Sequence, residues 1–293
     1  MNGLLLIDKP GGCTSHDVVN RWRKLANTKR VGHLGTLDPM ATGLLLLLTG
    51  TATRLAPYFA ADEKTYEAEI TLGLMSDTYD IEGQVIATGA SVPGDAAVIE
   101  SALRQFSGKF MQTPPPVSAK KISGVPAYKL HRRNVEFELK PVEVEVKRLE
   151  IRHIASGKVR LAITCTAGTY IRSIAHDLGH ALGCGGVLSS LRRTAVGAMR
   201  VENALNLETL TDLARTGKLT EALAPLRKLL PQFPAQHFDL QIETRIRQGL
   251  DFRTSPFVVP PGAPIVRALS RSGDLIALGE LKLPNIYHPS TVF

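Results

Sequence analysis

The arrangement of apolar and polar positions along the chain predicts several strands directly. Residues 44–48 are five consecutive leucines with turn-forming residues on either side, and residues 4–7 are a similar apolar run. Short runs of this kind are typical of strands that are buried on both faces. Residues 64–72 instead carry apolar side chains at every second position, which predicts a strand with one face in the core.

Two more alternating stretches predict a hairpin. Residues 142–151 change the phase of their alternation near residue 147, which a bulge would explain. Residues 159–165 alternate as well, and Gly157 falls in the turn between the two stretches. The hairpin and the strand at 64–72 favour a largely antiparallel sheet.

Helices are predicted where apolar residues recur every three to four positions, over residues 16–27, 95–106 and 171–182. Thr14 and Asp17 have the spacing of a capping box before the first of these helices. Strands and helices together predict an α+β fold. A connector punctuated by prolines ends near residue 236, where we place a domain boundary, and the remaining residues are mostly β in pattern.

Composition and charge narrow the class of protein. The 293 residues are 44% apolar, which is ordinary for a folded chain, and the net charge is +8 with a pI of about 9.5. This balance favours an anionic partner, with nucleic acid the first candidate and a membrane surface the second. We expect a cytoplasmic protein with reduced thiols, because the three cysteines are scattered and residues 1–9 do not resemble a signal peptide.

Asp38 is the candidate for chemistry. It lies in a loop rich in glycine and threonine that runs directly into the leucine run, and Pro39 keeps it out of helical geometry. A carboxylate anchored beside the core needs a partner or a task. Arg172 falls in the first turn of a predicted helix, where a cation opposes the helix dipole, so an anionic partner is expected nearby. That partner is either Asp38 or a phosphate; the plainer alternatives are a turn-capping aspartate and a surface arginine.

Residues 113–134 form a basic excursion rich in proline and glycine. It contains five basic residues and no acidic ones: Lys120, Lys121, Lys129, Arg132 and Arg133. Long loops of this composition are usually functional or disordered, and the charges suit contacts to phosphates. A solvated loop without a partner is the alternative.

Several motifs make a family resemblance specific. Residues 32–43 read G-H-x-G-x-L-D-P-x-A-T-G, and the other matching elements are K-P-x-x-x-T-S from Lys9, K-x-Y at 64–66, G-T-Y-I-R at 168–172 and L-R-R-T at 191–194. These elements resemble those of the TruB family of tRNA pseudouridine synthases, and they occur in the family's order. The resemblance is strong over residues 3–200 and much weaker beyond.

The resemblance implies roles for individual residues. Asp38 would be the catalytic residue, Arg172 its ion-pair partner, and Tyr66 the ring that stacks on the target base. Leu191 would line the pocket, and His33 would contact the RNA where the base is flipped out. Contacts to the RNA backbone would come from Lys9 and from the five basic residues of the excursion, which would act as a thumb over about 113–140.

The resemblance also implies an architecture and a reaction. Residues 1–236 would form a pseudouridine synthase domain with a mixed, largely antiparallel sheet flanked by helices, and residues 237–293 a reduced PUA-like RNA-binding domain. The enzyme, which we expect to be monomeric, would isomerise uridine 55 in the TΨC arm of tRNA. That reaction needs no metal or cofactor, and neither zinc spacing nor a nucleotide-binding motif occurs in the chain.

Two other classes remain open at this stage. A non-catalytic tRNA-binding or tRNA-folding protein would use the basic surface without Asp38. A phosphohydrolase with an aspartate nucleophile would need a second carboxylate to hold magnesium, as in D-x-D, but Pro39 and Met40 follow Asp38.

Overall fold

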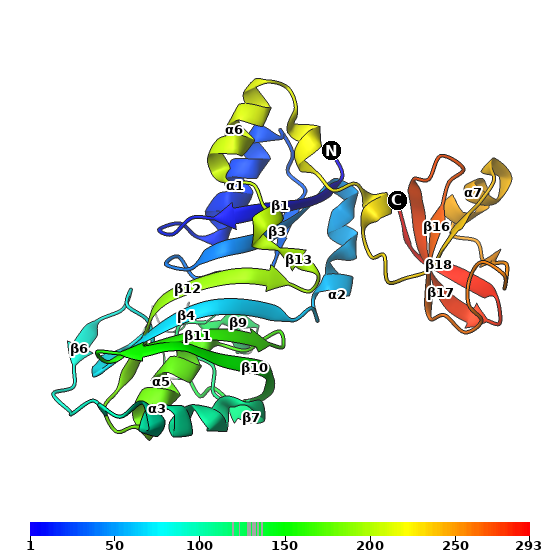
Figure 1. Cartoon of the computed structure of the whole chain (residues 1–293). Helices are drawn as coiled ribbons and strands as arrows, with labels where there is room; N and C mark the ends of the chain where they lie inside the picture. The colour runs from blue at the N-terminus through cyan, green and yellow to red at the C-terminus, as the bar shows by residue number, and fades with distance from the viewer. Residues whose placement is uncertain (119, 123, 128–129, 131–132, 134, 136) are drawn as a thin grey trace.

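The fold was obtained as a computed structural model, which describes residues 1–293 except 119, 123, 128, 129, 131, 132, 134 and 136. Among these residues, nine strands form the main sheet, which has the order β1-β3-β12-β4-β11-β10-β7, with β2 paired to β3 and β13 to β12. Pairing in this sheet is antiparallel except between β3 and β12. The mixed, largely antiparallel sheet of an α+β protein is therefore confirmed (Figure 1).

The strands of the main sheet are β1 (Gly3–Lys9), β2 (Val31–Leu34), β3 (Thr42–Thr49), β4 (Lys64–Leu72), β7 (Gly108–Gln112), β10 (Val142–Ala155), β11 (Lys158–Cys165), β12 (Gly186–Val196) and β13 (Met199–Arg200). Two ribbons stand apart from it, β5 (Leu74–Ser76) with β6 (Val85–Ala87), and β8 (Lys121–Ile122) with β9 (Val125–Pro126). A second sheet contains β14 (Ala235–His237), β15 (Phe252–Arg253), β16 (Ile265–Leu269), β17 (Leu275–Leu283) and β18 (Ile286–Val292).

The helices whose full extent lies among the described residues are α1 (Ser15–Leu25), α2 (Ala56–Phe59), α3 (Ala96–Leu103), α5 (Ile171–Ala181), α6 (Leu207–Arg215) and α7 (Leu240–Arg247). Short 3₁₀ turns are η1 (Gly50–Leu55), η2 (Arg104–Phe106), η3 (Val201–Asn203), η4 (Leu219–Ala222) and η5 (Leu226–Lys228). The expected capping box begins α1, since Thr14 accepts from the backbone N–H of Asp17 and the Asp17 carboxylate accepts in return.

Strand β3 is buried on both faces, as its leucines predicted. Leu45 and Leu47 face a core cluster that also includes the apolar face of β4 and residues of α1, α3 and α5. Leu44, Leu46 and Leu48 face a second cluster, which continues into strands β16 and β17 of the second sheet. β4 has the predicted bounds, and the predicted bulge appears as a register shift between Val146 and Arg148.

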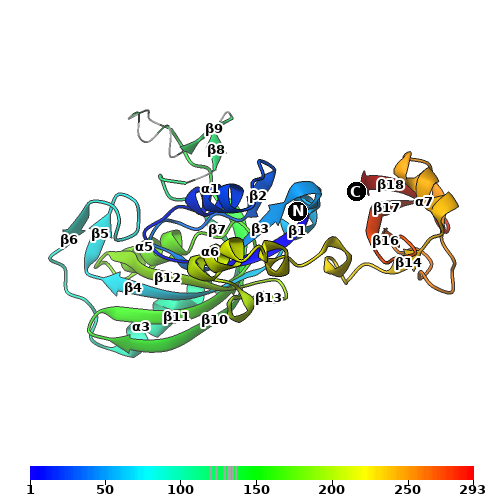
Figure 2. The same cartoon turned by 90° about the horizontal axis from the view of Figure 1, so that it is seen from above.

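The second sheet lies beyond the connector, at one end of the molecule (Figure 2). It provides the expected β-rich C-terminal part. The ring of Tyr58 contacts that of Phe233 edge-on, and Arg267 donates to the carbonyl of Phe233 at 2.9 Å, so the connector is packed against both sides. The domain boundary near residue 236 and the PUA-like role of residues 237–293 stay predictions.

Candidate active site

The loop that carries Asp38 joins β2 to β3, and hydrogen bonds to neighbouring segments hold it in place. Ser15 Oγ contacts both the N–H of Leu37, at 2.9 Å, and its carbonyl, at 3.1 Å. The carbonyl of Pro39 accepts from the backbone N–H of Gly12 at 2.9 Å. Gly43 ends the loop with φ of +96°, and a Cβ there would lie 2.3 Å from the carbonyl oxygen of Arg193. Only glycine fits this close approach of two strands.

Lys9 belongs to the support of this loop. Its side chain is fully buried, and the ammonium donates to the carbonyls of Pro10, Cys13 and Pro39 at 2.9, 2.7 and 3.2 Å. No part of this ammonium is open to a phosphate in this structure, which does not favour the predicted contact of Lys9 with the RNA backbone; that contact stays a prediction. The lysine instead ties the turn after β1 to the residue that follows Asp38.

Asp38 and Arg172 form the ion pair that the sequence allowed. Nε of Arg172 lies 3.0 Å from Oδ2 of Asp38, and Nη2 donates to Oδ1 at 3.1 Å. The Arg172 side chain is 5% exposed and that of Asp38 31%, so the carboxylate is the part that faces outward. Two carbonyls, of Thr78 and Val117, accept from the same guanidinium at 3.0 Å each.

Asp80 is a site residue that the sequence did not indicate. Its side chain is buried, with Oδ2 lying 3.4 Å from Nη1 of Arg172 and Oδ1 accepting from Thr78 Oγ1 at 2.7 Å. In the sequence, residues 76–80 read S-D-T-Y-D, a polar stretch that belongs to none of the motifs. Nothing in the spacing relates that stretch to Arg172, because the contact depends on where α5 packs.

Burial and two neighbours set the ionisation of Asp38. Burial raises the pKa of the Asp38 carboxyl above its ordinary value, the Arg172 guanidinium opposes that rise, and the Asp80 carboxylate adds to it. A buried cation beside a partly open carboxylate keeps the charged form available in a site that otherwise disfavours it. The arrangement suits a carboxylate that acts on a substrate.

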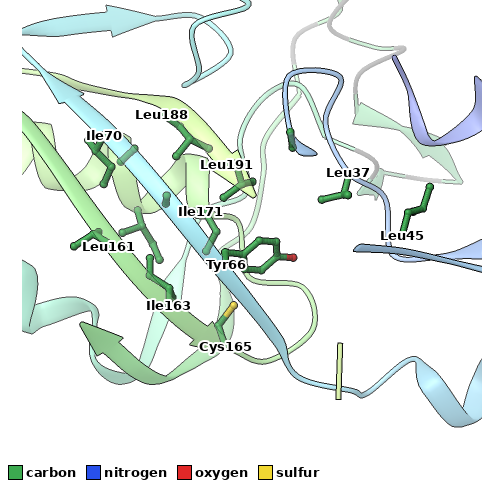
Figure 3. Close-up of a cluster of buried hydrophobic side chains, with 14 of the residues drawn as sticks. Leu37, Leu45, Tyr66, Ile70, Leu161, Ile163, Cys165, Ile171, Leu188 and Leu191 are labelled. Atoms are coloured by element: carbon green, nitrogen blue, oxygen red, sulfur yellow. The ribbon is translucent and has the colours of Figure 1, made fainter. Parts of the chain in front are cut away.

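Tyr66 and Leu191 form an apolar surface beside the Asp38–Arg172 ion pair. Both are buried in the same cluster as Leu37 and Ile171, and the Tyr66 ring points toward the side where the Asp38 loop lies (Figure 3). Burial raises the pKa of the Tyr66 hydroxyl, an effect that Arg193 opposes and Asp38 adds to. Tyr66 is therefore a neutral ring within electrostatic reach of the catalytic candidate.

The remaining predicted residues divide between the site and the basic excursion. His33 is partly buried in β2, with Nε2 lying 3.4 Å from Thr36 Oγ1, and burial and Arg193 lower its pKa, which favours the neutral ring. Lys120 and Arg133 are exposed, and Lys121 lies in β8. Lys129 and Arg132 lie outside the described residues.

The base of the excursion is attached to the site. Besides the Val117 carbonyl on Arg172, the side chain of Gln112 bonds both the carbonyl and the N–H of Tyr170, at 3.0 and 2.8 Å. Ser173 Oγ donates to the Thr113 carbonyl at 2.8 Å.

Within the described part of the chain, no group of three or more His, Cys, Asp or Glu side chains could hold a metal ion. No helix among the described residues is long and apolar enough to cross a membrane.

Comparison with known proteins matches this chain to a family. Residues 23–171 match the model for the N-terminal domain of TruB family pseudouridylate synthases, and residues 172–231 match the tRNA pseudouridylate synthase B C-terminal domain. The chain is 48% identical to the tRNA pseudouridine synthase B of Solibacter usitatus (strain Ellin6076), with all of both chains covered. It is 38% identical to that of Dehalococcoides mccartyi (strain ATCC BAA-2266 / KCTC 15142 / 195), covering 100% of this chain and 97% of the relative.

Solved structures agree with the sequence relatives. A Cbf5-Nop10-Gar1 complex contains a chain that is 26% identical with a TM-score of 0.73, covering 99% of this chain and 84% of that one. An H/ACA RNP bound to a substrate RNA containing 2'-deoxyuridine gives 25% identity and a TM-score of 0.71, with the same coverage.

Proposed function

Because the chain belongs to the TruB family of pseudouridylate synthases, we propose that it isomerises uridine 55 in the TΨC arm of tRNA to pseudouridine. The curated relatives are named tRNA pseudouridine synthases, so the class of reaction and of substrate follows from the family. The particular uridine and the roles of the residues are the proposal. The observation that carries it is the ion pair between a partly open Asp38 and a buried Arg172.

The reaction is an isomerisation, and its atoms balance without a co-reactant. The C1′–N1 glycosidic bond of uridine breaks, the uracil turns, and a new bond forms between C1′ and C5. C5 then loses its proton, and N1 gains one. The ionised Asp38 acts on the sugar, either as a nucleophile at C1′ or as a base, and both roles require the charge that Arg172 stabilises.

The target base must leave the RNA stack to reach a carboxylate at this depth. A flipped uracil needs an apolar platform, which the Tyr66 ring and Leu191 provide beside Asp38. His33, at the end of β2, would occupy the place that the base vacates or contact the RNA there. Lys120 and Arg133 would bind phosphates, and residues 237–293 would add a second RNA-binding surface.

The test is release of tritium from unmodified tRNA transcript labelled at C5 of uridine. We expect release from the wild-type protein, unaffected by a chelator and absent with a transcript that lacks uridine 55. Asp38→Asn should abolish release and leave tRNA binding largely intact. Release from both transcripts would contradict the assignment of the site, and tight binding without release would favour a tRNA-binding or tRNA-folding protein.

A further inference from the structure

The turn at residues 76–80 holds the inner side of Arg172. It leaves β5, supplies the Thr78 carbonyl and the Asp80 carboxylate to the guanidinium, and then pairs with β12 by an isolated bridge between Asp80 and Leu188. The Leu188 N–H donates to the carbonyl of Tyr79 at 3.0 Å. The position of this turn therefore contributes, with Val117 and Asp38, to where the guanidinium lies.

Tyr79, in the middle of the turn, has an unfavourable backbone conformation. Its φ is +66°, a left-handed value that bulky side chains rarely adopt. Such a residue persists only where its surroundings over-determine it, and strained residues of this kind gather at functional sites. Both backbone groups of Tyr79 are hydrogen-bonded, its N–H to the carbonyl of Ser76 and its carbonyl to the N–H of Leu188, and an interaction of its side chain adds to the contacts that offset the strain.

That interaction is a stack on His176. The two rings lie 3.8 Å apart between centroids and 8° from parallel. His176 lies one helical turn beyond Arg172 on α5, so it and Arg172 are neighbours on the helix surface. The stack joins the turn to the helix that carries the arginine, next to the contacts made by Thr78 and Asp80.

We propose that Tyr79 and His176 are a positioning pair, which holds the 76–80 turn against α5 so that Arg172 is directed toward Asp38. The inference rests on the proposed function, because it assumes that the Asp38–Arg172 pair performs the chemistry. Neither ring is placed in contact with the reacting atoms. Their effect reaches the reaction through the guanidinium, so it falls on turnover and not on RNA affinity.

Substitutions at Tyr79 separate the contribution of the ring from that of the backbone conformation. Asparagine tolerates left-handed φ but has no ring, whereas phenylalanine keeps the ring. We expect Tyr79→Asn to lower kcat for tritium release about three- to tenfold, with KM for tRNA within about twofold of wild type. Tyr79→Phe should restore kcat. Normal kcat in Tyr79→Asn, or a loss confined to KM, would overturn the proposal.

Substitutions at His176 test the other side of the stack. His176→Ala should lower kcat to the extent that Tyr79→Asn does, His176→Phe should restore it, and the double variant Tyr79→Asn/His176→Ala should be no slower than either single variant. Multiplied effects in the double variant would mean two independent roles and would contradict a pair. His180→Ala, exposed on the same helix, is the matched control and should be unchanged.

Folding and the proposed function are checked in the same series. The melting temperature is measured for each variant, and His176→Gln replaces His176→Ala if the latter does not fold. Wild-type protein without tritium release, or release by Asp38→Asn, would contradict the proposed function itself. An inactive Asp38→Asn together with a fully active Tyr79→Asn would overturn the positioning pair alone.

Discussion

Arg172 and Asp80 form a buried ion pair, with Nη1 3.4 Å from Oδ2 and both side chains 5% exposed. The guanidinium therefore serves two carboxylates, one enclosed and one facing outward. The enclosed carboxylate contacts the cation on the side away from Asp38's open face and so helps to orient it. It also adds negative charge beside Asp38.

Asp80→Asn tests this arrangement through the pH dependence of kcat. The Asp80 charge raises the pKa of Asp38, so its removal lowers that pKa. Because the proposed mechanism requires ionised Asp38, the acidic limb of the kcat profile should move to lower pH. At neutral pH kcat should fall about tenfold, since one charged contact that orients Arg172 is lost. Asp212→Asn, an exposed carboxylate on α6, is the control. An acidic limb that moves upward would contradict the charge argument.

Asp38→Asn should stabilise the folded protein while it removes activity. Burial raises the pKa of Asp38 in the folded state, so the fold binds the protonated form preferentially. Ionised Asp38 therefore lowers the free energy of unfolding as the pH rises through the unfolded and then the folded pKa. The neutral amide side chain of the variant does not ionise, so this loss of stability would not occur. The gain in the free energy of unfolding over the wild type should therefore be largest at neutral pH and shrink in acid. Urea unfolding at several pH values measures it.

Asp17 provides a control of opposite sign for that experiment. The hydrogen bonds with Thr14 lower the pKa of Asp17 in the folded state. The ionised carboxylate therefore stabilises the fold above the pKa of the unfolded state, and this stabilisation is lost as the pH falls through the pKa of the folded state. Asp17→Asn should therefore destabilise the protein at neutral pH. If both substitutions stabilise the protein, the effect comes from the change in net charge and not from the surroundings of Asp38.

Tyr66 should contribute through its ring. Tyr66→Leu keeps an apolar residue in the cluster but removes the stacking surface, and base–aromatic stacking contributes about 1–3 kcal/mol. We expect kcat/KM to fall roughly tenfold to hundredfold, and the melting temperature to change little. Tyr66→Phe keeps the ring and should retain much more activity. Equal losses in the two variants would assign the role to the hydroxyl instead.

The basic excursion should determine the salt dependence of tRNA binding. Lys120→Gln and Arg133→Gln, both at exposed positions, should each weaken binding and reduce the slope of log Kd against log salt by about 0.7–0.9 if one phosphate contact is lost. Turnover at saturating tRNA should be unchanged. Lys158→Gln, which removes a lysine paired with Glu69 at the far end of β11, is the control. An unchanged slope in both variants would remove these residues from the RNA interface.

The sequence predicted those features that depend on local pattern. Burial on one face produces alternation, so β4 was predicted with its observed bounds, and the change of phase near residue 147 marked a real register shift. The approach of Arg172 to Asp38 followed from a cation placed against a helix dipole together with the family motifs. Each of these features can be predicted from about ten neighbouring residues or from a matched motif.

The features that the sequence did not indicate involve contacts between distant segments. Lys9 is indistinguishable in the sequence from a surface lysine, because its three acceptors come together only when the turn after β1 meets the Asp38 loop. Asp80 and the stack of Tyr79 on His176 depend on the packing of α5 against a turn that precedes it by many residues. Such contacts have no periodicity and no fixed spacing.

The attachments of the Asp38 loop have a consequence for the choice of substrate. Ser15, Gly12 and Lys9 hold the backbone on both sides of the carboxylate, so under the proposed function the loop is restrained from following a misplaced uridine. The conformational work of presenting the base then falls on the RNA, and an arm that unstacks easily is favoured over one that resists, even where their sequences agree. Selection would then act on how readily the RNA deforms, as well as on which nucleotides it contains.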